Sequence, residues 1–157
     1  MLSVAIPKLI PIAYLPDYYT RYVGKFGKGN QFMAFVTATQ PSGRVPDWQK
    51  HKRWYAVLHT FDARGNHLAT EAWFAGSTAD GEKAVLEKAQ VKRLEMLAGL
   101  GNYRLCDIKL KLFRVEVDGH AFGLIDESSP EEGFQDRVVL RPNDFLFHAP
   151  WNGSYDT

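Results

Sequence analysis

The sequence contains a single cysteine, Cys106, and this scarcity excludes two kinds of structure. One thiol cannot form an intrachain disulfide bond, and it cannot supply a cysteine-based zinc site. A nucleophilic thiol needs a neighbouring base and a lowered pKa, and the sequence does not identify such a base. We therefore expect Cys106 to be a buried and inert thiol.

Long apolar runs are missing as well. The apolar stretch at residues 2–15 is interrupted by Pro7, Lys8 and Pro11, so it suits neither the core of a signal peptide nor a membrane-spanning helix. Nothing in the composition points to an oxidising compartment. We expect a cytoplasmic protein without a membrane segment.

Signatures of cofactor, metal or catalytic sites are also lacking. The histidines form no HxH, HxxH or HExxH pattern, and no GxSxG motif marks a serine hydrolase. The glycine-rich segment at residues 24–30 lacks the spacing of a phosphate-binding loop, and a strand-like run follows it, so a hairpin turn is predicted there. We therefore assign no catalytic residue, no metal ligand and no cofactor.

Aromatic residues, in contrast, make up 13% of the chain, and most fall in runs that are typical of strands. Residues 54–61 and 67–74 form the clearest pair. Residues 62–66 join them in a turn, in which Gly65 suits a positive φ. Because both alternating faces of residues 54–61 are apolar, we expect this strand to lie centrally in its sheet.

The second strand of this hairpin has two different faces. We expect Leu68, Ala72 and Phe74 on the buried face, and Trp73 on the face that is nearer to solvent.

One long helix is predicted after the hairpin, at about residues 79–99. Ser77 and Thr78 are candidates for its N-cap, and Gly99 or Gly101 ends it. Apolar residues recur on one face at helical spacing, namely Val85, Leu86, Ala89, Met96, Leu97 and Leu100. Arg93 falls among them, so its head should either reach solvent or join an internal ion pair.

The remaining strand signals predict hairpins. Residues 107–117 read as a strand whose buried face switches at Leu112 and Phe113, which fits a bulge or a change of partner. Asp118 and Gly119 are typical of a two-residue hairpin turn, and residues 137–140 and 144–148 suit short strands.

The predicted fold is therefore α+β, a single domain over residues 1–157. It has a largely antiparallel sheet of about five to seven strands, with the helix at about 79–99 packed on one face. Residues 1–22, rich in proline and tyrosine, should form an extended arm. Residues 141–157 should form a docked C-terminal tail.

Charge is unevenly distributed along the chain. The net charge is +1, yet residues 1–53 carry eight basic and two acidic residues. Lys50, His51, Lys52 and Arg53 lie between aromatic residues, a combination that can bind phosphates and stack on bases. Nucleic-acid binding through this basic third would require these residues to share one face with Lys25 and Lys28. Alternatively, the basic and acidic parts pack together and neutralise each other.

The C-terminal residues supply the other candidate sites. A protein partner would contact either the aromatic face of the sheet or the C-terminal region of Trp151 and Tyr155. His148 is the candidate centre of an enzyme pocket, which would need Asp156 and His59 to converge on it.

Four segments spread over most of the chain carry a family resemblance: PIAYLPDY, WQKHKRWYAVLHTFDARGNH with EAWFAG after it, DGHAFGLID, and FHAPWNGSYDT. They resemble a bacterial family labelled formate hydrogenlyase regulatory protein HycA-like. The resemblance implies a transcriptional regulator and brings no catalytic residues with it. No helix-turn-helix pattern accompanies it, because only one long helix is predicted.

The first functional hypothesis is a non-enzymatic regulatory or protein-interaction domain with an unidentified protein partner. The alternatives are nucleic-acid binding through the basic N-terminal third, and an enzyme with a pocket near His148. Homo-oligomerisation stays open.

Overall fold

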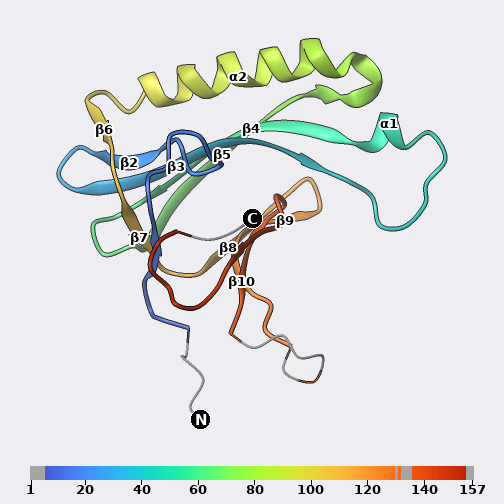
Figure 1. Cartoon of the computed structure of the whole chain (residues 1–157). Coiled ribbons are helices and arrows are strands. Elements are labelled where there is room, and N and C mark those ends of the chain that lie inside the picture. Colours follow the sequence, from blue (N-terminus) through green and yellow to red (C-terminus); the bar gives the residue numbers. More distant parts are fainter. Residues whose placement is uncertain (1–5, 130, 132–135, 155–157) are drawn as a thin grey trace.

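The hairpin predicted at residues 54–74 forms one side of a five-stranded antiparallel sheet, with its second strand at the edge (Figure 1). The computed structural model describes residues 6–129, 131 and 136–154. The strand order in this sheet is β5-β4-β3-β2-β6. Its members are β2 (Val23–Phe26), β3 (Asn30–Thr39), β4 (Arg53–Phe61), β5 (His67–Ser77) and β6 (Tyr103–Leu105). The β2–β3 hairpin confirms the turn predicted for the glycine-rich segment.

The β4–β5 turn is held by the side chain of Asp62. Its carboxylate accepts hydrogen bonds from the backbone N–H groups of Arg64 and Asn66, both at 2.9 Å. Gly65 has a φ of +86°, and a Cβ at this position would come within 2.8 Å of the Lys109 carbonyl oxygen. A larger residue would therefore be strained and would also clash. The turn predicted from the sequence is confirmed.

Both faces of β4 are buried, as predicted. Ala56 and Leu58 face helix α2 (Glu82–Ala98), whereas Tyr55 and Val57 face the opposite layer. The long helix is confirmed, but it begins at Glu82. A short 3₁₀ turn, η1 (Thr78–Asp80), precedes it, in which Ser77 and Asp80 form a capping box.

Strand β5 differs from the expectation in its burial. Its register places Trp73 opposite Ala56, on the helix side, where the ammonium groups of Lys88 and Lys92 lie over the indole. Trp73 is half-buried there. Leu68 is 54% exposed and Phe74 is 40% exposed. The reason is that β5 is an edge strand, and its irregular register leaves these two side chains incompletely covered.

A second antiparallel sheet covers the other face of the first one, with the order β11-β10-β9-β8. Its strands are β8 (Phe113–Val117), β9 (His120–Asp126), β10 (Val138–Arg141) and β11 (Phe145–Phe147). Asp118 and Gly119 both have positive φ, which confirms the predicted hairpin.

The change of partner predicted at Leu112 and Phe113 also occurs. Strand β7 (Ile108–Leu110) pairs with β1 (Ile10–Ile12), while β8 pairs with β9. The α+β class, the antiparallel pairing and the long helix are thus confirmed, but the strands are divided among three sheets.

The N-terminal segment, predicted as an extended arm, contains a short strand that the sequence did not predict. Residues 10–12 form this strand, and the side chains of Ile10 and Ile12 are fully buried. Pro11 lies between them, opposite Lys109 in a sheet of only two strands. Such an edge position tolerates the missing N–H group of a proline.

The described part of the C-terminal tail docks against this segment. The N–H group of Ala13 donates to the carbonyl of Gly153 at 2.9 Å, and Trp151 belongs to the core at 9% exposure. Tyr155 and Asp156 lie outside the described residues. Among the described helices, none is long and apolar enough to cross a membrane.

Candidate functional site

Past the first residue of strand β2, one edge of strand β3 has no neighbouring strand among the described residues. Val23, where β2 begins, pairs with Met33, and the next contact is the hydrogen bond from the N–H group of Ala34 to the carbonyl of Tyr22. From there the chain segment 17–21 runs beside β3. The hydroxyl of Tyr19 donates to the carbonyl of Val36 at 2.7 Å.

A cavity of about 530 Å³ opens along this edge, between segment 17–21 and helix α2. This volume is in the range of small-molecule sites. We call it the Arg93 pocket, and the described residues that line it are Asp17, Tyr18, Tyr19, Arg21, Phe35, Val36, Trp54, Leu86, Gln90, Arg93 and Phe145.

Arg93 is the exceptional residue of this pocket. It lies on the buried face of α2 and is only 6% exposed. Its guanidinium carbon lies 4.4 Å from the centre of the Tyr22 ring, and its Nε atom has no hydrogen-bond partner. None of the ion pairs formed by described residues includes Arg93. The residue is thus almost wholly buried, and it joins no ion pair with a described carboxylate.

The electrostatic consequence is an uncompensated positive charge. Burial lowers the pKa of Arg93, and the positive charge of nearby Arg21 lowers it further. A guanidinium nevertheless stays protonated at any physiological pH. Arg21 is exposed, so the pocket combines one buried cation with another that is open to solvent.

Aromatic rings form much of the pocket wall. The Tyr19 ring centre lies 5.8 Å from that of Phe35 and 6.1 Å from that of Phe145. Burial raises the pKa of Tyr19 to about 12, so this phenol is neutral and adds no negative charge. The indole N–H of Trp54 donates to the Thr78 hydroxyl at 2.9 Å, which leaves the Trp54 ring as an apolar surface.

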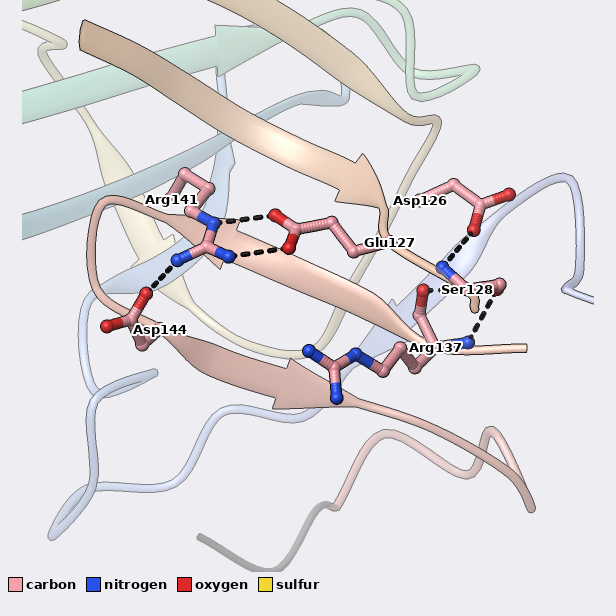
Figure 2. Close-up of polar contacts among 6 residues, drawn as sticks. All are labelled: Asp126, Glu127, Ser128, Arg137, Arg141 and Asp144. Carbon is pink, nitrogen blue, oxygen red and sulfur yellow. Dashed lines mark hydrogen bonds and ion pairs between the residues drawn. The ribbon is translucent and has the colours of Figure 1, made fainter. Parts of the chain in front are cut away.

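Phe145 reaches the pocket from the second sheet, and a charged clamp holds its hairpin in place (Figure 2). Arg141 donates two hydrogen bonds to Glu127, at 2.6 and 2.5 Å, and a third to Asp144. The bidentate geometry ties the end of β9 to the β10–β11 turn. The guanidinium of Arg141 lowers the pKa of Glu127.

The predicted basic cluster does not form one surface. Lys50 and His51 are exposed on the single-turn helix α1 (Trp48–His51). Lys52 lies over the Trp54 ring and 3.9 Å from Glu82. Arg53 is held by the Tyr55 hydroxyl at 2.9 Å and by Asp118 at 3.3 Å.

The other two lysines lie at the opposite end of the sheet. Lys25 pairs with Gln31, and Arg53 pairs with Thr39, so eight residues of β3 separate them, roughly 26 Å. Lys28 lies in the β2–β3 turn. The shared basic face that nucleic-acid binding would need is therefore absent for these residues.

The two described histidines of the predicted enzyme pocket, His59 and His148, do not line the Arg93 pocket. His59 is fully buried, with Nδ1 2.7 Å from the Thr70 hydroxyl, and burial lowers its pKa to about 3. His148 is half-buried, with Nδ1 2.7 Å from the carbonyl oxygen of Ala149. Trp151, a candidate contact residue, belongs to the core.

Sequence reasoning missed this pocket and the role of Arg21 in it. One signal was readable, namely an arginine among the apolar positions of the long helix. The rest comes from residues far apart in the chain, from Asp17 to Phe145.

Comparisons with known proteins add no further guide. No family model matches the chain, and no curated protein or solved structure matches it either. Within the described residues, no group of three or more histidine, cysteine, aspartate or glutamate side chains is arranged to hold a metal ion. What the Arg93 pocket offers chemically is a buried cation among aromatic rings, an arrangement suited to an anion carried on an apolar body.

Proposed function

We propose that this protein is a non-enzymatic regulatory domain that binds a small organic anion in the Arg93 pocket. The observation that carries the proposal is the buried guanidinium of Arg93, which has no carboxylate partner among the described residues. A buried charge without a partner costs several kcal/mol. An anion in the pocket would offset that cost.

The lining residues favour binding over catalysis. The described residues of the pocket include no histidine, cysteine, serine or lysine, and their one carboxylate is that of Asp17, an exposed residue. Tyr19, whose pKa is about 12, cannot exchange a proton readily near neutral pH. The pocket therefore offers orientation and charge compensation rather than proton transfer.

A regulatory role is supported by how the pocket is assembled. Its walls come from segment 17–21, from helix α2 and from β11 in the second sheet. A ligand would bridge these parts and reduce their relative motion, a change that a protein partner could recognise. The resemblance to a family labelled as regulatory agrees with this proposal.

Thermal unfolding in the presence of different anions tests the proposal. The anions are acetate, benzoate, phenylacetate and inorganic phosphate, compared at constant ionic strength. An anion present at 100 times its Kd should stabilise the protein by about 2.7 kcal/mol. For a chain of this length, that raises Tm by about 5–10 °C.

Two variants make the test specific. Arg93→Gln should abolish the increase in Tm. Arg64→Gln, which changes an exposed arginine of the β4–β5 turn outside the pocket, should keep it. The proposal is wrong if none of these anions raises Tm, or if the Arg93→Gln protein responds as the unchanged protein does.

A further inference from the structure

We infer that the ligand of the Arg93 pocket is a monocarboxylate on a flat, apolar body, such as an aryl carboxylate, held by the guanidinium of Arg93. This inference rests on the proposed function and narrows it to a ligand class. It follows from the burial of one guanidinium, the charges around it and the walls of the cavity.

Arg93 is the buried cation of the pocket. Its guanidinium carbon lies 4.4 Å from the centre of the Tyr22 ring. The Nε atom is sealed from solvent, so a ligand would be held by the two Nη groups. Their N–H groups lie in one plane and match the two oxygens of a carboxylate.

The charges of the pocket suit an anion of charge −1. Two cations, Arg93 and Arg21, face a single carboxylate, Asp17, among the described lining residues. A monoanion would bring this group to neutrality. A phosphate dianion would instead add excess negative charge near Asp17, and like charges at short range repel.

The pocket also lacks the backbone donors that commonly bind phosphate. Phosphate sites often use the free N–H groups at a helix N-terminus. Helix α2 begins at Glu82, and Arg93 lies eleven residues later, about 16 Å along the axis. The N-terminal N–H groups of α2 are therefore too far from Arg93 to share one phosphate with it.

The walls select for a flat apolar body. Phe35, Trp54 and Phe145 present aromatic rings, and Leu86 and Val36 add aliphatic surface. A planar ring can stack on such walls while its carboxylate reaches Arg93. An apolar body also removes water from the guanidinium, which strengthens the charge-assisted hydrogen bonds.

Isothermal titration calorimetry with paired probes tests the ligand class. The probes are benzoate and phenylacetate, the neutral analogue benzyl alcohol, the small anion acetate, and phenyl phosphate with inorganic phosphate. We expect at least one of the two aryl carboxylates to bind with a Kd about tenfold or more below those of all other probes, a difference of about 1.4 kcal/mol.

Arg93→Lys and Arg93→Gln complete the design, with Arg64→Gln as the control. Arg93→Lys keeps the charge but loses the planar fork, so aryl carboxylate binding should weaken about tenfold. Arg93→Gln should remove measurable binding, and Arg64→Gln should change nothing. Circular dichroism confirms that each variant is folded. If Arg93→Gln does not fold, the test of the guanidinium rests on the binding measured for Arg93→Lys.

The outcomes separate the two proposals. Tighter binding of phenyl phosphate or inorganic phosphate that still depends on Arg93 would overturn the carboxylate class and leave the proposed function intact. Equal binding of benzyl alcohol would also overturn the class, because charge would then be irrelevant. No Arg93-dependent binding of any anion would overturn both proposals.

Discussion

Arg93 carries a charge at a position where an apolar side chain would fit the ligand-free protein at least as well. It is buried on the helix face that otherwise holds Val85, Ala89, Met96 and Leu97. Its contact with the Tyr22 ring recovers only part of the cost of removing the charge from water. The residue is thus better explained by binding than by stability.

We expect Arg93→Met to leave the ligand-free protein as stable as before, or more stable by up to about 2 kcal/mol. Methionine fills a similar volume and removes the unpaired charge, although the contact with Tyr22 is lost. Urea denaturation followed by circular dichroism measures the change. A loss of stability of more than about 2 kcal/mol would mean that Arg93 has a strong partner in the folded protein.

His59 is a titratable group that is fully buried in the core, so its protonation is coupled to folding. Burial lowers its pKa to about 3, from 6.5, and the pKa of His67 is lowered as well, mainly by burial. Both histidines contact the hydroxyl of Thr70 at 2.7 Å. The folded state therefore favours neutral His59, while the unfolded chain takes up a proton below pH 6.5.

Stability should consequently fall as the pH decreases from about 6.5 toward 3. The slope for one histidine is up to about 1.4 kcal/mol per pH unit, so about 2 kcal/mol is lost between pH 7 and pH 5. His59→Gln should flatten this slope in urea denaturation at a series of pH values. His51→Gln, at an exposed position on α1, is the control, and equal slopes in both variants would argue against His59 as the cause.

Among the structural elements, those with short-range signals were predictable from the sequence. The Asp62–Asn66 turn, the Asp118–Gly119 hairpin and helix α2 each depend on residues within a few positions of one another. Strand β1 was missed because Pro11 argues against a strand and its partner, β7, lies about a hundred residues away. Local patterns say little about such distant pairing.

The hydrogen bonds from Arg141 to Glu127 and Asp144, which we call the Arg141 clamp, hold the β10–β11 turn next to Phe145. We expect Glu127→Gln to reduce the stability of the protein by about 1 kcal/mol near neutral pH, because a partly buried charged pair is lost. Binding of the pocket ligand should weaken too, since the β10–β11 turn is less firmly held. Chemical denaturation and calorimetry measure the two effects.

The ion pair of Arg141 with Glu127 also makes stability depend on pH. Here stability is lost at low pH because a carboxylate in the folded protein becomes protonated. The pKa of Glu127 lies below its ordinary value, so its contribution to stability is present above pH 4.5 and is lost as the pH falls through the lowered value. Glu116→Gln, at an exposed position on β8, is the matched control. If Glu127→Gln and Glu116→Gln lost the same amount of stability, Glu127 would not stabilise the protein through Arg141.

For the molecule as a whole, the pocket lies where its layers meet. Helix α2 and the second sheet pack on opposite faces of the five-stranded sheet, yet both contribute residues to the Arg93 pocket (Figure 1). This arrangement could not be read from the sequence. The residues from position 17 to position 145 meet only after the five-stranded sheet, the four-stranded sheet and helix α2 have packed together.

We expect a ligand such as benzoate, once shown to bind, to slow amide hydrogen exchange in segment 17–21 and in β11, because it contacts both. Strands β1 and β7 do not contribute to the pocket and should exchange as before. Hydrogen exchange with mass spectrometry measures this. Slowing spread evenly over all strands would contradict a local bridge.

Segment 17–21 also has a protective effect that is separate from ligand binding. The β3 edge that it lies against would otherwise display unpaired backbone groups, and such edges can recruit strands from other chains. Tyr19 occupies one of these groups, the Val36 carbonyl, and its ring shields the neighbouring surface. Displacing this short segment would therefore expose a template for aggregation, so the same residues that shape the pocket also keep neighbouring molecules apart.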